Sequence, residues 1–169
     1  MYKYQDIGFR PIEKKDLEAL RKLHNDMSTA LQMGTVDFYS DEDQLKWWES
    51  GVSNERNKRF AIVLNETDEV IGRLRILNID NINSNCEIGL DIVPELRGKG
   101  YGKKSYEMVL DFLFNQWNMH LVYLKVADFN PTAKKLYESI GFEYTGKFPE
   151  YLYRNGKYWD YLLMSIVKK

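Results

Sequence analysis

A glycine-rich turn, Arg97-Gly98-Lys99-Gly100-Tyr101-Gly102, is the stretch of this sequence whose residue types most directly suggest chemistry. A strand-like segment at 86–93 precedes it and closes with Pro94, and a helical pattern follows it through Trp117. Free N–H groups at the start of a helix, together with the helix dipole, favour a negatively charged ligand. Glycine lets such a ligand approach the backbone closely. The turn is therefore a candidate phosphate-binding site.

Two common phosphate-binding patterns do not match this turn. A Walker A loop needs glycine where the chain has Arg97, and serine or threonine where it has Lys104. A dinucleotide-binding G-x-G-x-x-G pattern would need its third glycine at Lys103, and no early strand-helix-strand unit surrounds the turn. The pattern that matches is R-x-x-G-x-G, from Arg97 to Gly102.

Strand and helix patterns alternate along the chain and must position this turn. Apolar and alternating runs predict about seven strands, at 7–12, 59–64, 70–77, 86–93, 121–126 and two within 144–167. Helical periodicity predicts about four helices, at 15–24, 40–51, 101–117 and 131–140. Asp16, Ser40 and Asn130 are suited to cap three of these helices, and Asn155-Gly156 to turn the last two strands into a hairpin. This order predicts one mixed α/β domain over residues 1–169.

Composition narrows the classes of function. The 24 basic and 25 acidic residues give a net charge of −1, so there is no general reason to bind nucleic acid. Cys86 is the only cysteine, and His24 and His120, the only histidines, are expected to be ordinary, partly buried residues. We therefore expect no metal site and no Ser-His-Asp triad. The N-terminus has no secretory core and no apolar run reaches the ~18 residues that span a membrane, so we expect a soluble cytoplasmic protein.

The wider context of the turn resembles the GNAT family of acetyl-coenzyme A-dependent N-acetyltransferases. The residues that carry the resemblance are Glu87-Ile88-Gly89-Leu90, Pro94-Glu95, the glycine turn, Asn130-Pro131-x-Ala133-x-x-Leu136-Tyr137 and Gly141-Phe142, with Phe9-Arg10-Pro11 and Asp16-Leu17 at the start. The tail from Gly146 to Asp160 looks like the ribosomal-protein and spermidine N-acetyltransferase branch. The resemblance covers essentially the whole chain. It implies a single-domain GNAT-like α/β fold, with about seven strands and four helices around splayed central strands.

By this resemblance, acetyl-coenzyme A (acetyl-CoA) is the donor substrate, and the backbone N–H groups of Gly98 to Gly102 hold its pyrophosphate. Arg97 and either Lys99 or Lys103 would add positive charge. The implied contacts are Leu90, Asp91, Ile92, Val93, Arg97, Gly98, Lys99, Gly100, Tyr101, Gly102, Lys103 and Asn130. The strand Leu90–Val93 would pair with the pantetheine arm, and an N–H near Asp91 or Ile92 would stabilise the oxyanion. Ordinary packing of a central strand is the alternative.

The resemblance also implies catalytic roles. Tyr137 would be the general acid that protonates the departing thiolate of coenzyme A. From its own position, Glu87 is the candidate to accept the proton of the incoming amine, because it lies on the strand that leads to the acetyl slot, flanked by Cys86 and Ile88. The alternatives are a core tyrosine at Tyr137 and, at Glu87, either binding of the acceptor or a structural role as partner for Arg73 or Arg75. Direct transfer without an acyl-enzyme makes Cys86 a packing residue.

The acceptor would bind among the two N-terminal helices, their loop and the last hairpin. Aromatic and apolar candidates are Met33, Phe38, Tyr39, Trp47, Trp48, Tyr151, Tyr153 and Trp159, and acidic ones are Asp37, Asp41, Glu42, Asp43, Glu49 and Asp160. Aromatic and acidic groups suit a cationic amine, so a small amine or polyamine is favoured. An amino-sugar nucleotide, a protein N-terminus, a non-catalytic acyl-CoA-binding module and a plain nucleotide-binding protein are the alternatives. Analogy suggests a homodimer through the C-terminal strands.

Overall fold

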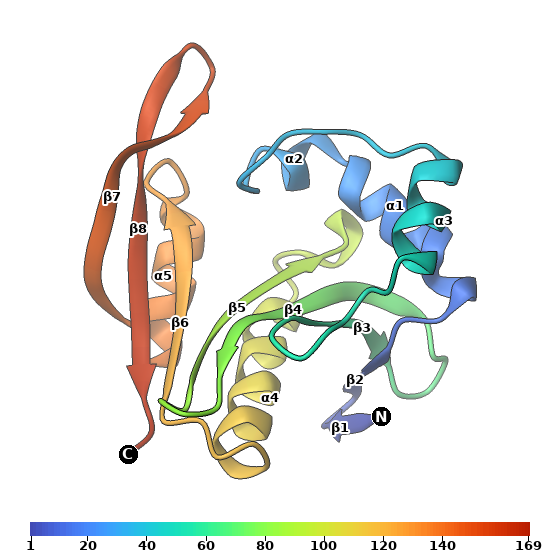
Figure 1. Ribbon diagram of the computed structural model, residues 1–169, viewed down its shortest axis with the longest axis horizontal. Helices are drawn as coiled ribbons and strands as arrows, with labels where there is room; N and C mark the ends of the chain where they lie inside the picture. The colour runs from blue at the N-terminus through green and yellow to red at the C-terminus, as the bar shows by residue number, and fades with distance from the viewer.

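The computed structural model describes residues 1–169 as an eight-stranded sheet with helices on both faces (Figure 1). The strands are β1 (Tyr2–Tyr4), β2 (Ile7–Pro11), β3 (Lys58–Leu64), β4 (Val70–Asp80), β5 (Asn85–Ile92), β6 (Leu121–Ala127), β7 (Glu143–Arg154) and β8 (Lys157–Val167). The helices are α1 (Leu17–Asn25), α2 (Met27–Ala30), α3 (Asp41–Glu49), α4 (Tyr101–Asn115) and α5 (Pro131–Ile140), with 3₁₀ turns at Lys14–Asp16 and Pro94–Leu96. The strand order is β1-β2-β3-β4-β5-β6-β8-β7, and only the β5–β6 pair is parallel. None of the helices is both long and apolar enough to cross a lipid bilayer.

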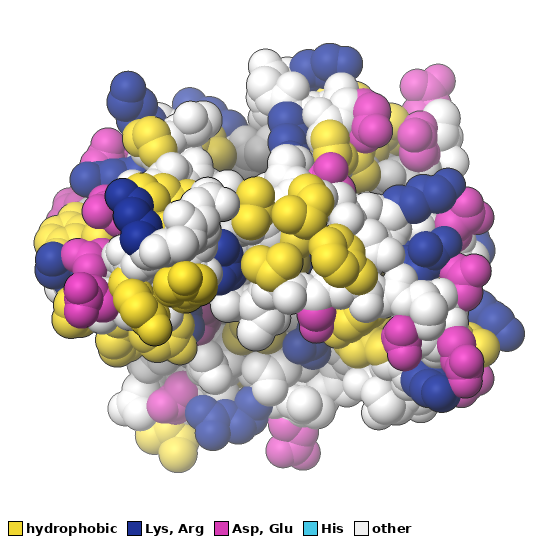
Figure 2. All heavy atoms as spheres, turned by 90° about the horizontal axis from the view of Figure 1, so that it is seen from above, with side chains coloured by type: hydrophobic (Ala, Val, Ile, Leu, Met, Phe, Trp, Pro, Cys, Tyr) yellow, Lys and Arg dark blue, Asp and Glu magenta, His cyan; other side chains and the backbone are white.

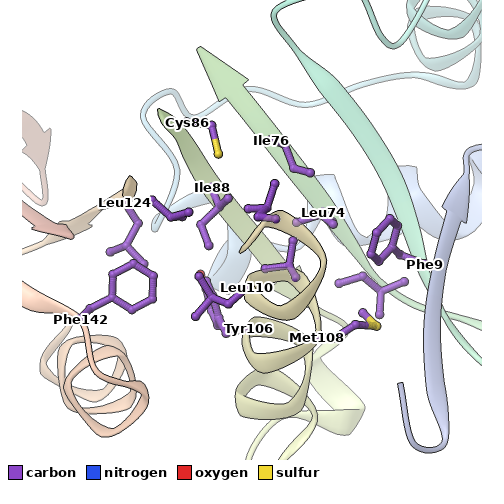
Figure 3. Packing of buried hydrophobic residues seen from close by; sticks show 14 of the residues in the cluster. Phe9, Leu74, Ile76, Cys86, Ile88, Tyr106, Met108, Leu110, Leu124 and Phe142 are labelled. Atoms are coloured by element: carbon purple, nitrogen blue, oxygen red, sulfur yellow. The ribbon is translucent and has the colours of Figure 1, made fainter. Parts of the chain in front are cut away.

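Alternating side chains along the strands divide between two cores, one on each face of the sheet. On β3, Ile62 belongs to the main core, whereas Ala61 and Val63 belong to a smaller one. The main core lies under α4 and α5, and Figure 3 shows among its members Phe9, Leu74, Ile76, Ile88, Tyr106, Leu110, Leu124 and Phe142. The smaller core lies under α1 and α3. The sheet is therefore the middle of three layers.

β5 separates from β6 partway along its length, and this separation opens the centre of the sheet. β5 pairs with β4 from Glu87 to Ile92. Its pairing with β6 is limited to Asn85 through Glu87, opposite Leu121–Tyr123. Beyond that point β6 continues beside β8 as far as Ala127. The two halves of the sheet diverge from a shared base, which confirms the predicted splay of the central strands.

The structure corrects several expectations drawn from the sequence. It has eight strands and five helices, because β1 and α2, with three and four residues, are too short to show a period. Asp16 does not cap α1. Its carboxylate instead accepts hydrogen bonds from Arg10 Nη1 at 2.7 Å and from the Glu13 N–H at 2.8 Å. Of the two histidines, His24 is buried, whereas His120 is exposed rather than partly buried.

Other local signals are confirmed. The side-chain oxygens of Ser40 and Asn130 accept hydrogen bonds, each at 3.1 Å, from the third N–H of α3 and α5. The Asn155-Gly156 turn joins β7 to β8, and one end of this hairpin extends beyond the rest of the sheet (Figure 1). The cap hydrogen bonds therefore mark where α3 and α5 begin, and the Asn155-Gly156 turn marks where β7 ends.

Replacing Leu74 tests the main core. Leu74→Ala should lower the free energy of unfolding by about 2–5 kcal/mol, because this side chain is 1% exposed and its loss leaves a cavity. Ile82→Ala is the control, because Ile82 is 93% exposed. We expect it to change stability by less than about 0.5 kcal/mol. Urea unfolding followed by circular dichroism measures both, and equal losses would contradict the assigned core.

Candidate active site

A cavity of about 800 Å³ occupies the gap between β5 and β6 and reaches the start of α4. Among the residues that line it are most of those predicted from the sequence: Glu87, Leu90, Asp91, Ile92, Arg97, Gly98, Gly100, Gly102, Lys103, Asn130 and Tyr137. Val93, Lys99 and Tyr101 are not among them. The Val93 N–H donates to the Ile71 carbonyl of β4 at 2.9 Å, Lys99 is exposed, and Tyr101 packs against the main core. The structure thus brings most of the predicted site together and leaves these three side chains outside it.

The glycine turn presents a row of unused backbone donors. None of the N–H groups from Gly98 to Lys103 donates to an acceptor of the protein. The first hydrogen bond of the following helix runs from the Lys104 N–H to the Gly100 carbonyl at 3.1 Å. Gly98 and Gly100 have φ angles of 73° and 87°, where a Cβ would be strained. Free N–H donors beside the positive end of the α4 dipole are the arrangement that favours an anion.

Arg97 is held by protein groups, which limits the role expected for its charge. Its Nε donates to the Ile92 carbonyl at 2.9 Å. Its Nη1 and Nη2 donate to the hydroxyls of Ser28 at 2.6 Å and Thr29 at 2.5 Å. Arg97 therefore ties the turn to α2. The side chain of Lys103 is exposed and lines the cavity, so it is the cation left free for a bound anion.

The free edge of β5 faces the cavity with alternate backbone groups. The Val93 N–H donates to β4. In an antiparallel pair the N–H and C=O groups of every second residue point to the same side, so those of Asp91 also point toward β4. The N–H and C=O groups of Leu90 and Ile92 therefore point toward the gap. Of the two positions expected to supply an oxyanion donor, Ile92 presents its N–H to the cavity and Asp91 does not.

The side chain of Asp91 holds two arginines of β4. Its Oδ2 accepts a hydrogen bond from Arg73 Nε at 2.8 Å and lies 3.3 Å from Arg75 Nη2. Burial raises the pKa of Asp91, but the charges of Arg75 and Arg73 prevail and hold it below its usual value. These arginines were the expected structural partners of Glu87, and that alternative is wrong because Asp91 takes both.

Glu87 has other partners at the base of the gap. Its Oε1 lies 3.1 Å from Lys125 Nζ of β6, and its Oε2 accepts a hydrogen bond from Asn78 Nδ2 at 2.9 Å. The residue is 9% exposed and lines the cavity. Lys125 also lines the cavity, and no pattern in the sequence marks it as a site residue. Glu87 is therefore a carboxylate in the cavity wall whose charge is balanced by an adjacent cation.

Tyr137 lines the cavity from α5, and its hydroxyl accepts a hydrogen bond at 3.1 Å from the Tyr106 hydroxyl of α4. Burial raises the pKa of Tyr137, and the hydrogen bond from Tyr106 offsets part of that effect. The phenol is therefore protonated at neutral pH, and its own O–H is free to donate. The sequence did not reveal Tyr106, because its place on an apolar helix face indicates only packing and no spacing links it to a residue 31 positions later.

Asn130 joins the two sides of the cavity. Its Oδ1 caps α5, and its Nδ2 donates to Gln32 Oε1 at 2.8 Å. Gln32 follows α2 and also lines the cavity. The predicted cap is confirmed, and both the oxygen and the nitrogen of the Asn130 amide have protein partners.

The residues expected to surround the acceptor are only partly brought together. Met33 and Tyr151 line the main cavity, and Met33 also lines a smaller one of about 140 Å³ with Tyr39 and Trp47. Of the others, Trp48 packs on the smaller core, Trp159 packs on Phe129, and Phe38 and Tyr153 are exposed. Aromatic groups from the predicted set therefore reach both cavities.

The acidic residues expected around the acceptor line neither cavity. Most of them pair locally: Asp37 with His24 at 2.9 Å, Asp41 with Arg21 at 2.6 Å, Glu42 with Lys46 at 2.8 Å and Asp160 with Lys147 at 2.6 Å. Asp43 belongs to the cap of α3, and Glu49 is exposed. The acids at the start of α3 thus take part in its cap, in an ion pair along the helix and in an ion pair with α1.

Family comparison agrees with this geometry. The model of the Acetyltransferase (GNAT) domain matches residues 6–143. The chain is 29% identical over 162 residues to the spermidine N(1)-acetyltransferase of Vibrio cholerae, covering 96% of this chain and 93% of that protein. It is 24% identical over 161 residues to that of Escherichia coli K12, covering 95% and 85%.

Solved structures of acetyltransferases have a similar fold. The spermidine N-acetyltransferase of Vibrio cholerae in complex with CoA and spermine superposes with a TM-score of 0.89, at 27% identity over 97% of this chain and 96% of that one. A dodecameric structure of the Vibrio cholerae enzyme in an intermediate state superposes with a TM-score of 0.81, at 28% identity over 97% and 95%.

Chemical labelling tests the packing role of Cys86. The thiol is fully buried, and burial raises its pKa to about 12. A disulfide reagent such as DTNB at pH 8 should therefore leave the folded protein unlabelled and modify one thiol per chain in denaturant. Cys86→Ala should also retain acetyl transfer. Stoichiometric labelling of the folded chain within seconds would contradict this assignment.

Proposed function

The chain belongs to the GNAT acetyltransferase family, and we propose that its cavity holds acetyl-CoA at the glycine turn for direct transfer of the acetyl group to a primary amine. The observation that carries this proposal is the continuity of the site. One cavity joins the unused N–H groups of the turn, the free edge of β5 and the hydroxyl of Tyr137. A long donor with a diphosphate at one end and a thioester at the other suits this order of groups.

The donor would lie along the cavity from the turn toward Tyr137. The N–H groups of Gly98 to Lys103 would bind the pyrophosphate, with the Lys103 ammonium adding charge. The free edge of β5 would pair with the amide groups of the pantetheine arm, which takes the place of the neighbouring strand that β6 no longer provides. The Ile92 carbonyl is already bonded to Arg97, so the N–H is the backbone group of Ile92 that is left for the donor. This places the thioester between β5 and α5.

The reaction would proceed by attack of a neutral amine on the thioester carbonyl. The Ile92 N–H is the candidate donor to the oxyanion of the tetrahedral intermediate. When the C–S bond breaks, the thiolate takes the proton of the Tyr137 hydroxyl, and the proton that the attacking nitrogen loses on becoming an amide restores that hydroxyl. The raised pKa of Tyr137, caused mainly by burial, keeps that proton in place beforehand. Tyr106 is a positioning residue, because its hydrogen bond orients the Tyr137 oxygen.

Glu87 is the candidate group that accepts the proton of the incoming ammonium. It lies at the base of the gap, where β5 and β6 diverge. Lys125 and Asn78 hold its two oxygens and so set its orientation. Tyr151 and Tyr161 line the same cavity with rings stacked at 5.5 Å, a surface that suits an alkylammonium group. Glu87 would therefore meet the amine beside this aromatic surface.

Polyamines are the acceptors we favour. The Vibrio cholerae and Escherichia coli relatives are spermidine acetyltransferases, and a Vibrio cholerae neighbour was solved with spermine. Tyr151 and Tyr161 would contact the chain of such a ligand, and Glu87 its reacting nitrogen. The aromatic lining and the relatives thus support one acceptor class.

Self-association is a further part of the proposal. β7 is an edge strand of the sheet, and Figure 2 shows hydrophobic side chains gathered over the β7–β8 hairpin, on the left. Its exposed aromatic residues are Tyr144, Phe148, Tyr151, Tyr153 and Tyr158. A homodimer through these strands would cover part of this surface, and a Vibrio cholerae neighbour forms a dodecamer. We therefore infer assembly through the C-terminal hairpin.

An acetyl-transfer assay with a panel of amines tests the proposed function. Release of the coenzyme A thiol from acetyl-CoA should depend on spermidine or spermine. Turnover restricted to an amino-sugar nucleotide or to N-terminal peptides would replace polyamines by those acceptors. Coenzyme binding without turnover on the whole panel would indicate a non-catalytic module. A calorimetric preference for ATP over acetyl-CoA would overturn the donor assignment.

Two substitutions test the catalytic roles. Tyr137→Phe and Glu87→Gln should each lower kcat by roughly 10²-fold or more, because each removes a proton-transfer group. Tyr4→Phe, on the opposite edge strand β1, and Glu66→Gln, in the exposed turn between β3 and β4, are matched controls and should leave kcat unchanged. Circular dichroism would show that all four variants fold. Unchanged turnover in both site variants would rule out these roles.

A further inference from the structure

The cavity of about 140 Å³ lies between α1, α3 and strands β3 and β4, on the side of the sheet opposite the main core. Its charged lining consists of Arg59, Arg73 and Arg75, and no carboxylate lines it. Met33 and Arg75 line both this cavity and the main one. We refer to it as the arginine pocket, and it adjoins the candidate active site.

Strand register places the three arginines together. Arg59 of β3 lies directly opposite Arg75 of β4, and Arg73 is two residues away on the same face. Like charges directly opposite each other destabilise a sheet. Asp91 pairs with Arg73 and Arg75, but no carboxylate pairs with Arg59. The pocket therefore has an excess of positive charge.

Most of the guanidinium donors are unused. Each guanidinium group carries five N–H donors. Arg73 directs three of them to Asp91, His24 and Met33, and Arg59 directs one to the Val52 carbonyl at 3.1 Å. Arg75 makes no hydrogen bond, and its buried Nε has no partner. Burial and the charge of Arg75 lower the pKa of Arg59, as expected of a cation without a counter-ion.

His24 does not neutralise this charge. Arg73 Nη1 can only donate, and it lies 3.3 Å from His24 Nδ1, so Nδ1 is the acceptor. The proton of the imidazole is then on Nε2, which donates to Asp37 Oδ1 at 2.9 Å. His24 is thus a neutral member of the lining. The pocket combines free donors and positive charge, which is the chemistry that binds an oxyanion.

We propose that the arginine pocket binds the carboxylate of acceptors that carry both an amine and a carboxylate, so that amino acids form a second acceptor class beside polyamines. The inference rests on the proposed acetyl transfer and concerns the same site. Paired guanidinium groups match a carboxylate in a bidentate way, which an ammonium group cannot do. Met33, an unbranched and flexible side chain, is the shared wall past which the acceptor chain would reach the main cavity.

Matched acceptor pairs test the proposal. Ornithine and 1,4-diaminobutane differ by one carboxylate, as do lysine and 1,5-diaminopentane. The amino acid of each pair should have the higher kcat/KM with the wild-type chain. Arg59→Gln should lower kcat/KM for ornithine roughly 10- to 100-fold and leave that of the diamine unchanged. Arg56→Gln, at an exposed position two residues before β3, is the control and should change neither.

Two further measurements separate the outcomes. Arg59→Lys keeps the charge without the bidentate fork, so it should give an intermediate loss and covers the case in which Arg59→Gln does not fold. Calorimetry of ornithine with the coenzyme A-loaded chain gives a result that does not depend on turnover.

Ornithine binding that Arg59→Gln abolishes would support the pocket, and it would do so even if no amine were acetylated, a result that would overturn the proposed function alone. Equal kcat/KM within each pair, together with no ornithine binding, would overturn the pocket and leave transfer to polyamines in place. Binding of inorganic phosphate without ornithine binding would also overturn the carboxylate assignment.

Discussion

The departure of β5 from β6 after three paired residues is the constraint on which the rest of this structure depends. A strand inside a sheet normally satisfies its backbone groups on both sides, and an open edge in the interior is unfavourable. Here the open edge makes room for the cavity and aligns it with the start of α4. The same divergence places Tyr137 of α5 across the gap from β5. The proposed donor would restore pairing to an edge that the protein leaves unpaired.

Strand alternation then decides which chemistry each face of the sheet receives. Arg73, Arg75, Glu87 and Asp91 lie at odd-numbered positions on the face toward α1, whereas their even-numbered neighbours Leu74, Ile76, Cys86, Ile88 and Ile92 belong to the main core. Packing and ion pairing are therefore separated by the sheet itself. A change of one residue in register would exchange the two faces and place these charges in the core. The apolar face thereby holds the charged face in position.

Local signals in the sequence were sufficient for most of the elements, though not for the short β1 and α2, and for the part of the site built from one segment. The glycine turn and the Ser40 and Asn130 caps depend on neighbours within a few residues, so their chemistry is visible in the sequence. Partners distant in sequence were not visible. Arg97 binds hydroxyls of α2 that lie 68 and 69 residues away, and Glu87 pairs with Lys125 instead of an arginine. Such pairings follow from strand order, which a single sequence does not reveal.

The contacts of Arg97 with Ser28 and Thr29 connect the turn of the proposed donor site to the helix that borders the acceptor side. A substitution that shifts α2 therefore also shifts Arg97 and the turn that follows it. If the proposed sites are right, a change in α2 that alters acceptor preference also alters coenzyme affinity. The proposed acceptor contacts at the arginines of β3 and β4 are not linked to the turn in this way, so they can change without moving it.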